Sequence, residues 1–497
     1  MIFYYDCSME PGQTFSVPCW FEVDGSRVSE TVKTFKTMKI GSVKKAFDKI
    51  TFNVGMMDAL ALRTWLPKNT LENYRSLGFN CLSIPIEKKR SDTFYSGDAP
   101  KTREDNFDLL YQEIRAKNLP FYMCTLETTT GAEGHVWTRK DPDAIGKKRD
   151  GSVGSPSEYG APPLCFTYRG KYYKDWIDKL CNSSAFDKYH ITWLGLDMEL
   201  WRSDMFEELC YCPRCQEQFK QFCIKNNRKD LAELDATKAD SPDFKKFWRM
   251  FQEECCSEFL RTMISAVESK VKGAKPTSPW GAFTKQDYGS PGPHCNLDDL
   301  DFFAISLYNT PDNNYRKFKE QREKYGMNKD IFGTWLSYGQ TMGCPDWHMT
   351  AVQCKENIFE VAIWGSKHIV YYFNTYLEPL RMKYIVDAIN TLQPLENMIR
   401  EGRIEDCIAV TNGKMLTTCR RLGDEHLLAV RSYHSNDALS GDITLKDFKV
   451  PLAVIDCETG KVLATVAPDK PSFAFSLPGN VCRLLYIGPE AKWNARH

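Results

Sequence analysis

The stretch His190-Ile-Thr-Trp-Leu-Gly-Leu-Asp-Met-Glu-Leu-Trp201 decides the fold, because it is a short apolar run between two long helical patterns. Helices are predicted before it, over residues 171–180, and after it, over residues 243–271. A buried strand enclosed by helices is typical of βα units, in which helical crossovers join parallel strands. The same alternation continues on both sides of this stretch.

Eight strands of this kind are predicted between about residues 50 and 400, over residues 51–56, 80–85, 120–126, 191–198, 279–284, 302–307, 331–337 and 368–373. Further helices are expected between them, for example over 71–77, 107–117 and 351–366. An open doubly wound sheet should have a Gly-rich phosphate turn after its first strand, and none follows residues 51–56. The sequence therefore predicts an α/β fold, a (β/α)8 TIM barrel.

Two β regions flank the predicted barrel. Residues 1–50 contain short alternating runs such as 14–23, which predict a small N-terminal β cap packed on the barrel. After Glu401 come short strands separated by Gly, Asn and Asp turns, over 407–411, 426–433, 442–445, 452–456, 472–477 and 481–487. These predict a C-terminal β-sandwich, so the expected domains are 1–50, 51–400 and 401–497.

Composition and charge exclude several classes of protein. The chain has 497 residues with 65 Lys+Arg and 65 Asp+Glu, and a net charge of zero offers no long-range attraction to nucleic acid. No apolar run approaches the ~18 residues of a membrane span, so no membrane partner is expected.

The 19 cysteines are an odd number spread over a long chain, which favours mostly free thiols in a reducing compartment. Because residues 1–6 lack a signal-peptide pattern, we expect a cytoplasmic protein, or an exported one whose leader is absent from this chain. Homo-oligomerisation is left open.

Asp197 and Glu199 end the fourth predicted strand and are the candidate catalytic residues. In a barrel, catalytic groups come from the C-terminal ends of the strands, and residues i and i+2 of a regular strand share a face. Two acids brought close together push one pKa upward, which gives a proton donor beside an ionised carboxylate. This pairing is typical of glycosidic bond cleavage. The alternative is an acidic strand end that pairs with a nearby Lys or Arg.

A Cys-x-Cys-x-x-Cys motif, made of Cys210, Cys212 and Cys215, follows this strand at the start of a helix predicted over 216–223. Three thiolates and one further ligand can hold a structural Zn²⁺ tetrahedrally. Cys165 is the candidate for that fourth ligand, with Cys124, Cys181 and Cys295 as competitors. Three buried free thiols are the alternative interpretation.

These residues together resemble glycoside hydrolase family 42, the barrel β-galactosidases. The resemblance covers residues 160–225 and rests on Pro-Leu-Cys165, the strand ending in Glu199, the Cys-Tyr-Cys-x-x-Cys motif, and aromatic residues at Tyr168, Tyr172, Trp176, Phe219 and Phe222. It implies that Glu199 is the acid/base and that Cys165, Cys210, Cys212 and Cys215 are the zinc ligands. The chain then looks like a distant relative within that group of barrels.

Two positions depart from the family's pattern. Met198 stands where the family has Asn, and strand seven, over 331–337, lacks the family's nucleophilic Glu. A second carboxylate must therefore come from another acid near a strand end: Glu127, Asp287, Asp312, Asp346 or Glu378. Each of these acids alone is as well explained by a bond to a helix N-terminus. The Asp-x-Glu strand end is also similar to that of chitinase-like and family 25 barrels, where Asp supports a neighbouring group or a water.

Aromatic and polar residues at the predicted strand ends are the candidate sugar contacts, because an aromatic ring stacks on the apolar face of a pyranose. They are Trp201, Trp280, Tyr308, Trp335, Tyr338, Tyr371, Tyr372, Asn374 and His294. The expected function is hydrolysis of a β-linked oligo- or polysaccharide. The alternatives are a barrel that binds carbohydrate without cleaving it, a substrate-assisted N-acetylhexosaminidase-type hydrolase, and a hydrolase of another polar substrate such as an amide or ester.

Overall fold

The computed structural model of the chain describes residues 12–36, 40–54, 72, 75–85, 103–118, 122–129, 137–154, 162–182, 188, 193–200, 208–270, 281–284, 303–307, 309–325, 332–337, 349–372 and 379–497. All secondary structure discussed below lies within these ranges.

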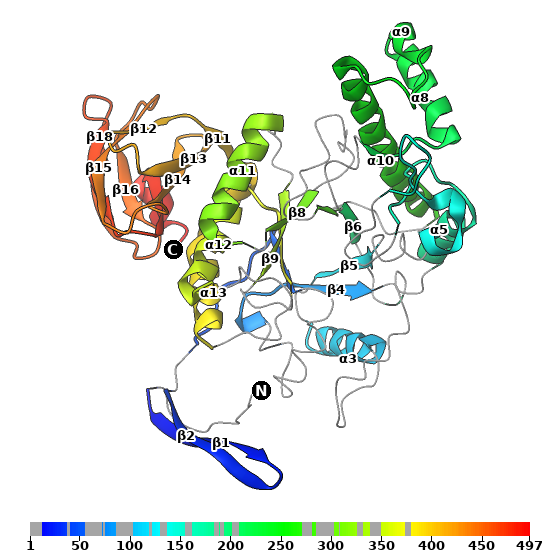
Figure 1. Cartoon of the computed structure of the whole chain (residues 1–497). Coiled ribbons are helices and arrows are strands. Elements are labelled where there is room, and N and C mark those ends of the chain that lie inside the picture. Colours follow the sequence, from blue (N-terminus) through cyan, green and yellow to red (C-terminus); the bar gives the residue numbers. More distant parts are fainter. Residues whose placement is uncertain are drawn as a thin grey trace.

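Eight parallel strands form a closed barrel at the centre of the molecule (Figure 1). In chain order they are β3 (Thr51–Val54), β4 (Cys81–Pro85), β5 (Tyr122–Thr129), β6 (Trp193–Leu200), β7 (Gly281–Thr284), β8 (Phe303–Leu307), β9 (Phe332–Ser337) and β10 (His368–Tyr372). Each strand pairs with the next along the chain, and β10 pairs with β3, where His368 lies opposite Thr51. The eight strands correspond to the eight predicted ones.

Helices follow or separate these strands. They are α3 (Arg103–Ala116), α5 (Lys171–Cys181), α8 (Pro213–Lys225), α9 (Lys229–Ala232), α10 (Pro242–Lys270), α11 (Pro311–Tyr325), α12 (Ala351–Ile363), α13 (Pro379–Leu392) and α14 (Glu396–Glu401), with 3-10 turns η1 (Pro142–Ala144) and η2 (Gln393–Leu395). Helix α12 begins at Thr350, where the side chains of Thr350 and Gln353 form a capping box. Every residue from Glu356 to Ile363 is buried, as expected for a helix between two packed layers.

The N-terminal end of the barrel is closed by the segment 40–50. The Asn80 side-chain amide donates to the carbonyls of Phe47 and Ile50 at 2.8 and 2.9 Å, and its oxygen accepts from the Phe52 N–H at 2.8 Å. The ring of Phe52, in β3, stacks on the ring of Phe79 at 4.5 Å. This network satisfies the buried backbone groups at the floor of the barrel.

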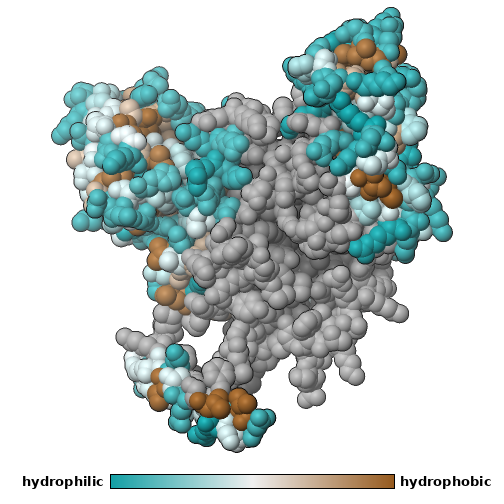
Figure 2. All heavy atoms as spheres, in the orientation of Figure 1, coloured by the Kyte–Doolittle hydropathy of each residue, from teal (hydrophilic) through white to brown (hydrophobic). Residues whose placement is uncertain are grey.

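The N-terminal β region is a separate hairpin. Strand β1 (Thr14–Val23) pairs antiparallel with β2 (Ser26–Lys36) in a two-stranded sheet of their own. None of the hairpin's described side chains is buried, and Trp20, Val28 and Val32 are 42%, 60% and 60% exposed. Figure 1 shows the hairpin standing away from the barrel, and Figure 2 shows apolar colour on it. The predicted strand over residues 14–23 is present, but of the described part of the predicted 1–50 cap only the segment 40–50 packs on the barrel, because alternation of apolar and polar residues predicts strands and not the surface that covers them.

The C-terminal region contains two facing sheets. One has the order β11 (Arg403–Glu405), β13 (Leu416–Leu422), β14 (Glu425–Arg431), β19 (Cys482–Gly488), β16 (Leu452–Asp456) and β17 (Val462–Val466). The other has the order β12 (Ile408–Val410), β15 (Leu439–Leu445) and β18 (Ser472–Leu477), and a short helix, α15 (Glu490–Asn494), follows β19. Apolar residues of both sheets, among them Leu428, Val430, Ile443 and Phe473, form one buried cluster between them.

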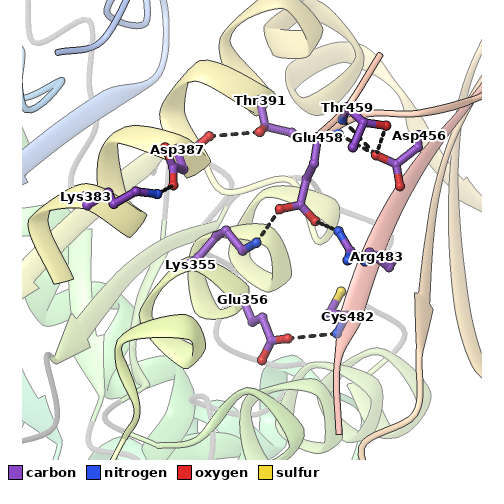
Figure 3. Close-up of polar contacts among 10 residues, drawn as sticks. All are labelled: Lys355, Glu356, Lys383, Asp387, Thr391, Asp456, Glu458, Thr459, Cys482 and Arg483. Carbon is purple, nitrogen blue, oxygen red and sulfur yellow. Dashed lines mark hydrogen bonds and ion pairs between the residues drawn. The ribbon is translucent and has the colours of Figure 1, made fainter. Parts of the chain in front are cut away.

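The larger sheet packs against α12 and α14 through polar as well as apolar contacts. Figure 3 shows Glu458, in the turn after β16, between Lys355 of α12 and Arg483 of β19, with Arg483 Nη1 at 2.6 Å from its carboxylate. Deeper in, Glu360 of α12 accepts bonds from Arg431 Nη2 at 2.8 Å and from the Tyr433 hydroxyl at 2.6 Å. Glu360 and Arg431 are both fully buried, so a charge pair joins the barrel to the β-sandwich.

Two further properties of the described residues bear on the sequence predictions. Thirteen of the described cysteines form no disulfide, which agrees with the expectation of mostly reduced thiols, whereas Cys81 is disulfide-bonded. None of the described helices combines the length and apolar character that a bilayer-spanning helix needs.

Candidate functional site

Asp197 and Glu199 lie near the C-terminal end of β6, the fourth barrel strand. On one side β6 pairs regularly with β5, where Asp197 lies opposite Thr129. On the other side the pairing passes from Leu196 opposite Ala282 to Leu200 opposite Thr284, so β6 has three residues where β7 has one. Such irregularities re-aim side chains and are frequent beside active sites. The pairing with β7 is thus irregular over the segment that contains these two acids.

The other candidate residues are only partly within the described chain. Trp335 lies in β9, Tyr371 and Tyr372 end β10, and Glu127 lies in β5. Asp312 is in the first turn of α11, where its carboxylate accepts from the Thr310 hydroxyl and lies 3.6 Å from Arg316 Nη2, which supports its interpretation as a helix-start acid. Nine candidates lie outside the described residues: Trp201, Trp280, Asp287, His294, Tyr308, Tyr338, Asp346, Asn374 and Glu378.

Four cysteine sulfurs converge in the segments that follow β5 and β6 along the chain. The Sγ atoms of Cys165, Cys210, Cys212 and Cys215 all lie within 4.8 Å of one another. Cys165 Sγ is 3.6 Å from Cys215 Sγ and 3.9 Å from Cys212 Sγ. A tetrahedron with Zn–S bonds of about 2.3 Å has S···S edges of roughly 3.8 Å. The four sulfurs therefore have the spacing of a closed tetrathiolate site.

The cluster joins two segments on the C-terminal face of the barrel. Cys165 comes between β5 and α5, and the other three cysteines come between β6 and the first turn of α8. Aromatic side chains hold the second segment, because the Tyr211 ring stacks on Trp248 of α10 at 4.1 Å and Phe219 lies 4.7 Å from the same indole. In Figure 1 helices α8, α9 and α10 form a separate group at the upper right of the barrel. The cysteines thus bring together the segments after the third and fourth strands, on the face where barrel enzymes place catalytic groups.

Three groups that the sequence analysis did not single out surround the sulfurs. The Thr167 hydroxyl lies 3.1 Å from Cys165 Sγ and 3.2 Å from Cys215 Sγ. Arg214 Nε donates to that hydroxyl at 2.9 Å, its Nη2 donates to Cys165 Sγ at 3.5 Å, and the Lys147 N–H donates to Cys210 Sγ at 3.2 Å. These donors offset negative charge on the sulfurs. The position of Arg214 inside the cysteine motif was the one signal in the sequence that could have revealed it.

The acidity of the thiols depends on their mutual contacts. Hydrogen bonds from the neighbouring thiols lower the pKa of Cys165 well below its usual range, and the bond from Cys210 has the largest effect. The same contact with Cys165 raises the pKa of Cys210. Cys165 is therefore readily a thiolate, which is the form that binds metal.

Comparisons with known proteins point to the fold. No protein-family model matches the chain, and no curated protein matches its sequence. A variant of the family 36 α-galactosidase AgaA from Geobacillus stearothermophilus, in complex with raffinose, superposes with a TM-score of 0.56 at 12% identity, over 89% of this chain and 55% of that chain. A second variant, with 1-deoxygalactonojirimycin, gives 0.55 at 12% identity over the same shares. The α-amylase from Geobacillus thermoleovorans, complexed with acarbose, gives 0.49 at 12% identity, over 89% of this chain and 99% of that chain.

The first two of these likenesses concern the fold alone. The chain spans about half the length of the α-galactosidase and shares the fold of that part. They do not single out family 42, which the sequence motif resembles.

Proposed function

We propose that the protein is a glycoside hydrolase that cleaves a β-linked oligo- or polysaccharide, with Glu199 as general acid/base and Asp197 as its partner. The observation that carries the proposal is the position of both acids at the C-terminal end of a barrel strand, in the segment where its pairing with β7 is irregular. The fold likeness to a glycosidase supports the reaction class. The β-linkage rests on the sequence resemblance around residues 160–225.

The test is a screen of aryl α- and β-glycosides and of polysaccharides with the wild-type chain and Glu199→Gln. Loss of a general acid/base should lower kcat/KM by about 10²–10⁴-fold. Glu217→Gln is the matched control, because this exposed carboxylate on α8 pairs with Lys220 and should leave the rate unchanged. Hydrolysis of α-glycosides alone would overturn the β-linkage, and equal rates for wild type and Glu199→Gln would overturn the role of Glu199. Binding of sugars without turnover would favour the non-catalytic alternative.

A second measurement addresses Asp197. We expect Asp197→Asn to lower kcat by ~10²-fold or more with little change in KM, because its charge acts mainly as the positive transition state develops. Product configuration, followed by NMR in the first minutes, would assign retention or inversion. Near-wild-type turnover of Asp197→Asn would remove this residue from the mechanism.

We also propose that the four cysteines hold one structural Zn²⁺. The spacing of their sulfurs and the donors around them fit a tetrathiolate site. Bound zinc would cross-link the segments after β5 and β6, and so would fix the strand end that bears Glu199. This role is structural, because four protein ligands leave no open position for substrate.

Elemental analysis of protein purified without chelator tests this proposal, with one zinc per chain as the expected result. Cys215→Ala should lose the metal, whereas Cys223→Ala, which removes another buried thiol from the same helix, should keep it. Arg214→Gln should release zinc to a chelator more readily, by about 10–100-fold in affinity, because a donor to Cys165 is lost. Less than about a tenth of an equivalent of zinc in the wild type would contradict the proposal.

A further inference from the structure

Two cysteines of the C-terminal region meet where the chain crosses from one sheet to the other. Cys407 lies in the connection between β11 and β12, and Cys419 lies in β13. Strand β11 is an edge of the six-stranded sheet and β12 is an edge of the three-stranded sheet. A bond between these two side chains would therefore link the segment that connects the two sheets to β13, beside the edge strands β11 and β12.

The two sulfurs are already in contact. Cys407 Sγ donates to Cys419 Sγ at 3.1 Å, and both residues are 3% exposed within the apolar cluster between the sheets. Since a disulfide S–S bond is about 2.05 Å long, an approach of about 1 Å would close it. Two other buried thiols of residues 401–497, Cys457 and Cys482, lack such a contact. The pair also differs from the four-sulfur cluster, because no third metal-ligating side chain of the described residues joins it.

We propose that Cys407 and Cys419 are a disulfide-forming pair that covalently links the two sheets of the sandwich. The oxidant is a small or protein disulfide, such as glutathione disulfide. The thiolate of one cysteine attacks a sulfur of that disulfide, forms a mixed disulfide and releases one thiol. The thiolate of the other cysteine then displaces the second thiol. In sum, two protein thiols are oxidised to one disulfide, and one disulfide is reduced to two thiols.

The surrounding structure supplies a route for the oxidant. Strands β11 and β12 have three residues each and stand at sheet edges, where local opening needs the least free energy. Beside the pair, an exposed ion pair between Arg421 and Glu405, at 3.2 Å, holds β11 to β13. The Cys407 carbonyl accepts from the Lys446 N–H at 2.9 Å, which ties the connecting segment to the loop after β15. Opening of this edge exposes Cys407 without disturbing the central strands.

The expected consequence is a sandwich whose stability depends on redox conditions. The bond would close a loop of about a dozen residues, which restricts the unfolded chain and raises the unfolding midpoint by a few degrees. In a reducing compartment the pair stays as two thiols. In an oxidising one the sheets are locked together.

Peptide mapping of the full chain tests the proposal directly. Trypsin cuts after Arg403, Lys414 and Arg420, so residues 404–414 and 415–420 each contain one cysteine of the pair. The native protein, and protein refolded from denaturant, are equilibrated with defined ratios of reduced and oxidised glutathione. They are then alkylated in denaturant and digested without reductant. We expect a linked species of these two peptides, lighter by two hydrogens than their sum, and a higher unfolding midpoint in the same samples.

The controls separate this pair from other thiols. Cys419→Ala should remove the linked species and the redox dependence of the midpoint, whereas Cys457→Ala, another buried thiol of the sandwich, should retain both. Recovery of both peptides in alkylated form at excess oxidised glutathione, in native and refolded protein alike, would overturn the proposal. So would a linkage of either cysteine to Cys457 or Cys482 in preference to the other. The proposed zinc ligands do not affect the result, because the peptides that contain Cys165, Cys210, Cys212 and Cys215 have other masses and are identified separately in the map.

Discussion

The hairpin near the N-terminus and the sandwich at the C-terminus are both β structure with alternating sequences, but they differ in what they bury. The hairpin has no buried side chain among its described residues, and its two strands pair only with each other. The sandwich has its own apolar cluster and also sets fully buried Arg431 against Glu360 of α12. Alternation of apolar and polar residues therefore predicts strands at both ends of the chain, whereas the attachment of these strands to the barrel depends on particular charged residues.

The largest effect should follow from breaking the buried pair. In Glu360→Ala, Arg431 keeps only neutral hydrogen-bond partners, Thr418 and the Ala429 carbonyl, in a fully buried position. Loss of one partner of a buried ion pair typically costs about 3–5 kcal/mol. Denaturant unfolding of the full chain measures the change in free energy of unfolding. The matched control is Asp387→Asn, which breaks the half-exposed Lys383–Asp387 pair and should change the free energy by less than about 0.5 kcal/mol. Equal effects of the two variants would mean that the sandwich is not held by this pair.

A pH series should sharpen the comparison. Burial raises the pKa of Glu356 to about 7, against the opposing effect of the bond from the Cys482 N–H at 3.0 Å. Because the folded state holds this proton more tightly than the unfolded state, its contribution is present at low pH and is lost as the pH rises through about 7. The unfolding free energy of Glu356→Gln should therefore gain on the wild type by about 2–3 kcal/mol between pH 5 and pH 8. A constant difference between the two proteins across this range would contradict the assignment.

A smaller effect is expected at the outer part of the same interface. Glu458 bridges Lys355 and Arg483 and is 14% exposed (Figure 3). Glu458→Gln should lower the free energy of unfolding by about 1 kcal/mol, because these partners reach solvent more easily than Arg431 does. Thermal unfolding with and without added salt checks the result, since the wild-type advantage should shrink as salt screens the pairs.

The smallest effect should come from the hairpin. Removal of residues 12–36 takes away no described buried side chain, so the free energy of unfolding of the remaining chain should change by less than about 0.5 kcal/mol. Thermal unfolding compares the shortened chain with the full one. A drop of several degrees would show that the hairpin stabilises the barrel, as the predicted cap would have done.

The barrel strands could be read from the sequence because each is a short apolar run between helical patterns. Three strands of the C-terminal region, β11, β13 and β17, were missed. Strand β13 contains Arg420 and Arg421, which interrupt the apolar pattern, yet Arg420 is fully buried and donates to the carbonyls of Met398 and Ile363 at 3.3 Å each. A buried arginine satisfied by helix-end carbonyls cannot be distinguished from an exposed one without knowledge of the tertiary fold.

The candidate site was predictable where residues are close in sequence. The spacing of Cys210, Cys212 and Cys215 indicated a metal site, and Cys165 was the candidate for its fourth ligand, as the resemblance to family 42 also implied. The structure places the Cys165 sulfur with theirs. Thr167 and Arg214 were not predicted, because a hydroxyl or a guanidinium that bonds to a cysteine sulfur has no characteristic sequence pattern. The irregular pairing at residues 197–199 was also missed, since it depends on the register of β7, a strand about eighty residues away.

Closure of the barrel by β10 against β3 has a consequence for how the chain is made. Thr51 and His368 are 317 positions apart, so the first strand leaves the ribosome long before its second neighbour exists. During that time β3 has only β4 beside it, and one of its backbone edges lacks the partner that it has in the finished barrel. Such long-range pairing slows folding and leaves partly formed sheets open to aggregation. Production of the protein should therefore benefit from slow synthesis at low temperature more than from any change at the surface of the finished fold.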